Sequence, residues 1–84
     1  MSFQLVTKRS FDKEFAALPK DIQRRVAEAF LALRDAPFPP GSVKLKGTAS
    51  YRIRVGDYRV IYHPDPPNQI IRLLAVGHRR DIYR

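Results

Sequence analysis

The sequence predicts an α+β fold, in which two N-terminal helices cover one face of a mostly antiparallel four-stranded sheet in the order β-α-α-β-β-β. Three observations lead to this prediction. Apolar residues recur at helical spacing between residues 11 and 34, runs of aromatic and β-branched residues flank Gly56-Asp57, and residues 69–76 are almost continuously apolar. A chain of 84 residues is expected to form one domain, residues 1–84, with a single core.

The first half of the chain predicts a short strand followed by a helical hairpin. Residues 3–7, FQLVT, are the strand candidate, and Ser10 is placed to cap the first helix. A second helix is expected from about Lys20 to Arg34, because its apolar residues form one stripe. Pro19 separates the two helices, so we expect both to lie on the same face of the sheet.

The second half predicts three strands. Residues 36–42, APFPPGS, contain three prolines and a glycine and are expected to form a loop. A β-hairpin follows over residues 51–62, YRIRVGDYRVIY, and residues 63–68, HPDPPN, predict a second turn. Residues 69–76, QIIRLLAV, predict a central strand that is buried on both faces.

The hairpin divides its side chains between the two faces of the sheet. Because Gly56-Asp57 suits a two-residue type II′ turn, Arg54 is expected directly opposite Arg59. This pair lies on one face with Arg52, while the core face receives the alternate residues Tyr51, Ile53, Val55, Tyr58, Val60 and Tyr62. Opposed like charges destabilise a hairpin by about 0.2–1 kcal/mol, and an anion between them makes the contact attractive. The alternative is a solvated basic face with splayed arginines.

The charge of the chain is concentrated in its second half. The net charge is +8, and residues 43–84 hold nine basic and three acidic residues, whereas residues 1–42 hold seven and five. This asymmetry predicts a polyanionic partner, either nucleic acid or an acidic protein. A membrane surface is disfavoured, because the cations lie on expected strands and not on an amphipathic helix.

Several classes of site and location are disfavoured by what the sequence lacks. There is no cysteine, so disulfides and thiolate metal sites are excluded. Without a signal-peptide pattern or an apolar run of about 18 residues, we expect a cytoplasmic protein. The basic half has only Asp57, Asp65 and Asp81 as acidic residues, too few for a two-metal nuclease, so no metal and no cofactor are expected.

The residues that remain suit metal-free cleavage of RNA, in which the 2′-hydroxyl is a built-in nucleophile. Arginine matches phosphate oxygens and stays charged, histidine transfers protons near neutral pH, and tyrosine stacks on bases or transfers protons. Each residue also has a simpler interpretation. His63 and His78 suit ordinary surface positions, and the tyrosines suit packing.

Three segments together resemble the RelE/ParE toxin superfamily of type II toxin–antitoxin systems: LKG (45–47), YRIRVGDYRVIY (51–62) and VGHRRDIY (76–83). The helical segment FDKEFAALPKDIQRRV (11–26) is also similar to the family's first helical pair. The resemblance covers nearly the whole chain and is nearest to the RelE-like branch. It implies a RelE-like fold and a metal-independent endoribonuclease, an mRNA interferase that cleaves in the ribosomal A site through attack of the 2′-hydroxyl and so inhibits translation.

The resemblance assigns catalytic roles to four residues. The phosphate-stabilising arginine of the family's GxYR motif falls on Arg59, the arginine after the last strand on Arg79, and the terminal tyrosine on Tyr83. His78 precedes Arg79 where some members have lysine. In a regular strand His78 faces away from Gly77 and Arg79, so we rank Tyr83 ahead of it for proton transfer.

The resemblance also places the family's basic pair on Arg52 and Arg54. The type member has lysines at these two positions, and arginine is a poor base, so the pair is expected to supply charge. The residues expected to bind RNA are Arg52, Arg54, Lys44, Lys46, Arg80 and Arg84. For Arg80 and Arg84, a general cationic surface is the simpler alternative.

The implied partners are a short acidic antitoxin, the ribosome and mRNA, with toxin and antitoxin forming a hetero-oligomer. Two alternatives stay open: a ParE-like inhibitor of DNA gyrase without catalysis, and an inert nucleic-acid-binding domain. The presence of Arg59, Arg79 and Tyr83 together favours the ribonuclease branch.

Overall fold

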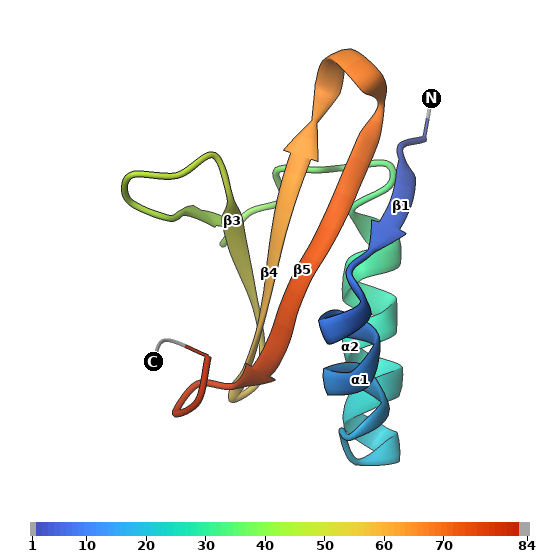
Figure 1. Ribbon diagram of the computed structural model, residues 1–84, viewed down its shortest axis with the longest axis vertical. Coiled ribbons are helices and arrows are strands. Elements are labelled where there is room, and N and C mark those ends of the chain that lie inside the picture. Colours follow the sequence, from blue (N-terminus) through green and yellow to red (C-terminus); the bar gives the residue numbers. More distant parts are fainter. Residues whose placement is uncertain (1, 83–84) are drawn as a thin grey trace.

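A twisted sheet forms the centre of the protein, and a helical hairpin packs on one of its faces (Figure 1). The computed structural model describes residues 2–82. The strand order is β1-β5-β4-β3-β2. The elements are β1 (Gln4–Thr7), α1 (Arg9–Ala16), α2 (Lys20–Ala32), β2 (Val43–Lys44), β3 (Tyr51–Val55), β4 (Tyr58–Asp65), a 3₁₀ turn (Pro66–Asn68) and β5 (Ile70–His78).

The predicted α+β class is confirmed, with one strand more than the four expected. The additional strand is β2, whose Val43 and Lys44 pair with Arg52 and Tyr51 at the edge of the sheet. β1 runs parallel to β5, and the other pairings are antiparallel. Two residues carry too little sequence pattern to predict a strand on their own.

The expected cap of the first helix is wrong. α1 begins at Arg9, its N-cap is Lys8 without a side-chain hydrogen bond, and Ser10 lies inside the helix. The backbone N–H of Lys8 donates to Leu73, so the chain passes from sheet pairing straight into the helix. At the other end of α1, the Gln23 side chain donates to three backbone carbonyls, those of Phe15, Ala16 and Leu18. These bonds satisfy carbonyl groups that a helix end leaves open.

The hydrophobic core lies between the sheet and the two helices. Val26, Val60, Tyr62, Ile71 and Leu73 have no exposed surface. The rings of Phe11, Phe15 and Phe30 meet at 5.8–6.2 Å and join α1 to α2. Full burial of each such apolar side chain contributes about 1.5–3 kcal/mol, so this layer holds the hairpin of helices on the sheet.

The second turn is shorter than the sequence predicts. β4 continues through His63, Pro64 and Asp65, which were expected in a turn, and only Pro66–Asn68 form the connection to β5. Pro64 lies in a paired strand opposite Ile71. The long β4–β5 ribbon therefore projects beyond the remaining strands (Figure 1).

β5 carries a bulge that decides which of its residues face the site. Ile61 pairs with Ala75 and Tyr62 pairs with Leu73, so Leu74 is the extra residue. The bulge shifts the alternation of side chains between the two faces by one residue, so that Ile71, Leu73 and Val76 are all buried. The prediction that this strand is buried on both faces is wrong, because Arg72 is exposed on the face that the helices leave open.

The edge of β5 beyond β1 is closed by a side chain. β1 ends at Thr7, and the Glu14 carboxylate of α1 accepts the N–H of Val76 at 3.1 Å. Edge strands of this kind are often blunted by charged groups. Within residues 2–82, neither helix has the length and apolar character that crossing a membrane requires.

Candidate functional site

The β3–β4 hairpin has the predicted register. Arg54 pairs with Arg59, and Tyr51 pairs with Tyr62. Gly56 has a φ of +61°, which the first position of a type II′ turn requires and which glycine adopts without strain. The turn therefore sets two arginines directly opposite one another on the face that the helices leave open. We call this the open face.

Arg59 is the only charged side chain that is buried among the described residues, with 7% of its surface exposed. Its Nη1 donates to the carbonyl oxygens of Tyr58 at 3.2 Å and Gly56 at 3.4 Å. No carboxylate within residues 2–82 forms an ion pair with it. A buried charge of this kind is costly unless a partner neutralises it, so the position favours an anionic ligand.

The chain after β5 folds back beside this arginine. The N–H of Arg79 donates to Asp57 O at 2.8 Å, and the N–H groups of Asp81 and Ile82 donate to His78 O. The Ile82 Cδ1 atom is 3.7 Å from the position that a Cβ on Gly77 would occupy. Because Gly77 is the pairing partner of Arg59, residues 79–82 lie over the open face next to Arg59.

His78 points to the other face of the sheet. It pairs with Tyr58, and the two rings make an edge contact at 5.4 Å. Its Nδ1 accepts the backbone N–H of Arg80 at 3.2 Å, which places the proton of a neutral ring on Nε2. β5 runs through His78 without turning at Gly77, so the imidazole is held away from Arg59.

The structure brings only some of the predicted RNA-binding residues together. Arg54 is exposed on the open face next to Arg59, and Arg52 follows on the same face. Lys44 pairs with Tyr51 and so belongs to the opposite face at the sheet edge. Lys46 and Arg80 are exposed in the loop before β3 and in the turn after β5. Tyr83 and Arg84 lie outside the described residues.

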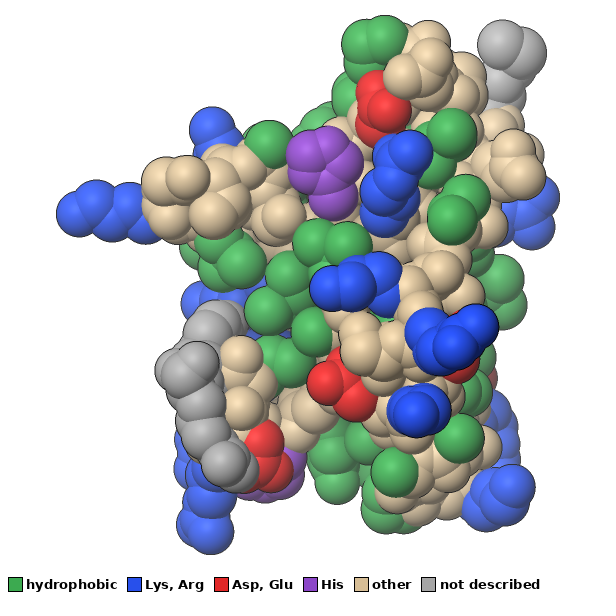
Figure 2. Space-filling view, in the orientation of Figure 1, with side chains coloured by type: hydrophobic (Ala, Val, Ile, Leu, Met, Phe, Trp, Pro, Cys, Tyr) green, Lys and Arg blue, Asp and Glu red, His purple; other side chains and the backbone are tan. Residues whose placement is uncertain are grey.

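The far end of the open face contains charges of both signs. His63 pairs with Arg72, whose Nη1 lies 3.7 Å from Asp65 Oδ2. Asn68 donates to the same carboxylate oxygen at 2.9 Å. Figure 2 shows this mixture near the tip of the β4–β5 ribbon, with a histidine beside a basic and an acidic side chain. Cationic charge is therefore offset at this end, whereas Arg59 forms no ion pair with a carboxylate of residues 2–82.

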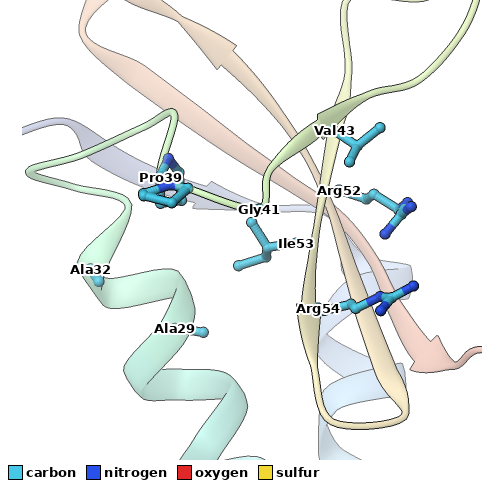
Figure 3. A pocket seen from close by; sticks show the side chains of 9 residues that line it. Ala29, Ala32, Pro39, Gly41, Val43, Arg52, Ile53 and Arg54 are labelled. Atoms are coloured by element: carbon cyan, nitrogen blue, oxygen red, sulfur yellow. The ribbon is translucent and has the colours of Figure 1, made fainter.

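A groove of about 520 Å³ opens at the sheet edge between β3 and α2. Ala29, Ala32 and Ile53 form apolar parts of its wall. In Figure 3 the Ile53 side chain points toward α2, while Arg52 and Arg54 point away from the helix. β2 pairs with β3 only at residues 51 and 52, so the edge of β3 beyond them is open. No sequence pattern predicts this groove, because it depends on how the loop 36–42 folds.

Arg25 is a further residue of this region that no sequence pattern singles out. Its guanidinium contacts the hairpin turn at Gly56, although α2 and this turn are about thirty residues apart in the chain. Arg25 lies three residues after Ile22 and four before Ala29, at the border of the apolar stripe of α2, and nothing in the sequence indicates what it touches. No group of three or more potential metal ligands occurs within residues 2–82.

The comparisons with known proteins agree with this architecture. The model of the ParE toxin family, described as the ParE toxin of the type II toxin–antitoxin system parDE, matches residues 5–83. No curated protein matches the chain.

Solved structures of RelE toxins are similar to this chain over most of its length. RelE in the archaeal RelE–RelB complex of Pyrococcus horikoshii is 32% identical, with a TM-score of 0.84, and covers 96% of this chain and 99% of its own. A chain of the RelBE2 complex of Mycobacterium tuberculosis is 24% identical, with a TM-score of 0.82 and coverage of 94% and 100%. The isolated RelE toxin of E. coli is 19% identical, with a TM-score of 0.82 and coverage of 92% and 84%.

The family-model match spans nearly the whole chain, and the P. horikoshii protein exceeds 30% identity over almost the full length of both chains. The recognition of the superfamily from three sequence segments is thereby confirmed. The chain belongs to the RelE/ParE superfamily of type II toxin–antitoxin toxins.

Proposed function

We propose that this toxin is a metal-independent endoribonuclease that cleaves mRNA, with Arg59 as the residue that binds the reacting phosphate. The observation that carries the proposal is the burial of Arg59 on the open face without a carboxylate partner among residues 2–82. An RNA phosphate supplies the missing negative charge. Two hydrogen bonds to backbone carbonyl oxygens already hold the guanidinium, so it needs little reorganisation to bind the phosphate.

The proposed reaction uses the 2′-hydroxyl of the substrate as the nucleophile. Its oxygen attacks the adjacent phosphorus, the bond from phosphorus to the 5′-oxygen breaks, and a 2′,3′-cyclic phosphate and a 5′-hydroxyl remain. The proton of the 2′-hydroxyl leaves to a base, and the departing 5′-oxygen gains a proton. Arg59 stabilises the charge that develops on the non-bridging oxygens, while Arg54 and Arg52 hold the neighbouring backbone.

Proton transfer is assigned to Tyr83 ahead of His78. His78 contacts Tyr58 on the face opposite to Arg59, which speaks against its direct contact with the reacting phosphate. Tyr83 follows the turn of residues 79–82 that lies next to Arg59. Arg79 enters the same turn with an exposed side chain and is proposed to contact the substrate backbone.

Inhibition of DNA gyrase is the second candidate function. The family model that matches the chain is the one for the ParE toxin, and a structure described as a YoeB/ParE toxin from Agrobacterium tumefaciens is similar in fold at 16% identity. A gyrase inhibitor needs a binding surface and no reacting phosphate. The buried Arg59 therefore favours RNA cleavage over this alternative.

Two assays on the same purified protein separate the candidates. Translating ribosomes are incubated with the toxin, and the 5′ ends of the mRNA are mapped; gyrase supercoiling is measured in parallel. The proposal expects new mRNA ends that require the toxin and unchanged supercoiling. Intact mRNA together with inhibited supercoiling would replace the proposal by the ParE-like alternative.

We propose further that the antitoxin lays an acidic segment with apolar side chains along the groove between α2 and β3. Several of the similar structures are complexes with RelB antitoxins, the groove is apolar, and Arg52 and Arg54 provide positive charge beside it. The open edge of β3 offers backbone groups to an added strand.

A matched pair of variants tests this surface. Ala32 lines the groove, whereas Leu31 is its exposed neighbour on α2 and does not line it. Ala32→Gln is expected to weaken antitoxin binding at least tenfold, measured by titration, and Leu31→Gln to change it less than twofold. Equal effects of the two substitutions would remove the groove from the antitoxin interface.

A further inference from the structure

Arg25 reaches from the middle of α2 to the tip of the β3–β4 hairpin. Three atoms of its guanidinium, Nη2, Nη1 and Cζ, lie 3.1, 3.5 and 3.7 Å from the position that a Cβ on Gly56 would occupy. Because Cζ is the farthest of the three atoms, the edge of the guanidinium that carries Nη1 and Nη2 faces the glycine. The φ of +61° is the stronger constraint on Gly56, since the end of the flexible Arg25 side chain can move aside for an added methyl group.

The turn that Arg25 contacts also fixes the groups of the proposed active site. Gly56 O and Tyr58 O accept the two hydrogen bonds from Arg59 Nη1. Asp57 O accepts the N–H of Arg79 and so anchors the start of the turn that lies over the open face. A displacement of residues 56–58 would move the Arg59 guanidinium and this turn together.

We propose that Arg25 is a positioning residue for Arg59, acting through the backbone of the Gly56–Tyr58 turn and not through the substrate. This inference rests on the proposed RNA cleavage. The guanidinium of Arg25 lies next to the turn on the side that faces α2. The hydrogen bonds of Arg59 hold the same turn from β4. A shift of about 1 Å in a group that stabilises a transition state lowers rates strongly, even when binding is retained.

The role depends on the forked end of the guanidinium, which presents two nitrogen atoms to the turn. Lysine keeps the charge but ends in a single ammonium group. A positioning role therefore predicts that Arg25→Lys behaves like Arg25→Ala. A direct contact between Arg25 and an RNA phosphate predicts instead that lysine restores most of the function and that alanine weakens binding.

The kinetic test uses single-turnover cleavage of mRNA on ribosomes, with Arg24→Ala as the control. Arg24 is the neighbouring exposed arginine of α2. We expect Arg25→Ala and Arg25→Lys to lower the maximal rate about five- to tenfold at an unchanged half-saturating ribosome concentration, and Arg24→Ala to change neither quantity more than twofold. Rescue by lysine, weaker binding, or an equal loss in Arg24→Ala would overturn the proposal.

Two further measurements do not require activity. The backbone amide resonance of Gly56 should shift in Arg25→Ala and stay in place in Arg24→Ala, because the guanidinium of Arg25 lies next to this residue. The NMR resonance of Arg59 Nε should also shift in Arg25→Ala and stay in place in Arg24→Ala.

These measurements test the RNA cleavage and the link between Arg25 and Arg59 separately. If the wild-type toxin does not cleave mRNA, the proposed function fails, while shifted Gly56 and Arg59 signals in Arg25→Ala would still establish the linkage between Arg25 and Arg59. An Arg59 resonance that is unchanged in Arg25→Ala would contradict the linkage whatever the activity.

Discussion

Arg59 and Tyr62 are nearly buried polar side chains of the same strand, β4, but they lie on opposite faces of the sheet. Tyr62 has no exposed surface, and its hydroxyl donates to Pro37 O at 2.8 Å. Arg59 is 7% exposed and donates to two backbone carbonyls. The tyrosine is neutral and satisfied, whereas the arginine is charged and has no described carboxylate partner.

The difference shows how one strand separates stability from function. A neutral hydroxyl with a good hydrogen bond adds to the stability of the core, because its polar group is satisfied within the protein while its ring is buried. A buried guanidinium that bonds only to carbonyl groups keeps its charge available, and this costs stability. The core face and the open face should therefore respond in opposite ways to substitution.

The largest effect is expected at Arg59. Arg59→Ala should lower single-turnover mRNA cleavage about 10²–10³-fold, because one preorganised charged donor to the transition state is lost. Thermal unfolding should show a protein that remains folded. Arg72→Ala is the control, since Arg72 lies on the same face but pairs with Asp65, and it should change cleavage less than about twofold. A folded Arg59→Ala variant with full activity would end the assignment.

Tyr62→Phe should give the reverse result. Loss of the bond to Pro37 O is expected to lower the free energy of unfolding by about 1 kcal/mol, while cleavage stays within about twofold of wild type. Denaturant unfolding and single-turnover cleavage of the same samples measure the two effects. A variant with unchanged stability and impaired cleavage would contradict the separation of the two faces.

The stability contributed by Tyr62 should also depend on pH. Burial raises the pKa of Tyr62 above its ordinary value of 10.0, the nearby Tyr51 raises it further, and a hydrogen bond with Ser42 opposes the shift. Between pH 10.0 and the folded-state pKa, the unfolded chain releases this proton while the folded protein keeps it. The stability advantage of wild type over Tyr62→Phe should therefore shrink as pH rises above 10.0, and an advantage that grows there would refute the assigned shift.

The smallest effect is expected at Arg54, which is exposed on the open face. Arg54→Ala should weaken RNA binding about three- to fivefold, because an exposed charge contact is worth about 1 kcal/mol or less. It should also reduce the slope of log affinity against log salt by about 0.7, the value for one phosphate contact to a single strand. Titrations at several salt concentrations measure both quantities. Lys44→Ala is the matched control on the opposite face and should leave the slope unchanged.

The hairpin and the helices were predictable because their signals are local. Gly56-Asp57 determines the turn type, the turn determines the register, and the register places Arg54 opposite Arg59. Helical periodicity and Pro19 similarly located α2 from Lys20 onward. The open arginine face thus followed from the sequence alone.

The features that sequence reasoning missed depend on distant parts of the chain. The bulge at Leu74 arises from the pairing of β5 with β4, and β4 extends through Pro64 because Ile71 pairs with it. The chain after β5 folds back so that Ile82 lies against Gly77, the pairing partner of the buried Arg59. The contact of Arg25 with Gly56 requires the packing of α2 on the sheet. None of these contacts leaves a periodic pattern.

The chemical form of the cleaved RNA ends tests the central claim most directly. Ribosomes programmed with a defined mRNA are incubated with toxin, and the 3′ end of the upstream fragment is identified by mass spectrometry. Attack by the 2′-hydroxyl at the phosphate that Arg59 binds predicts a 2′,3′-cyclic phosphate, or the 3′-phosphate formed from it, and an opposite 5′-hydroxyl. A 3′-hydroxyl with a 5′-phosphate would contradict the account.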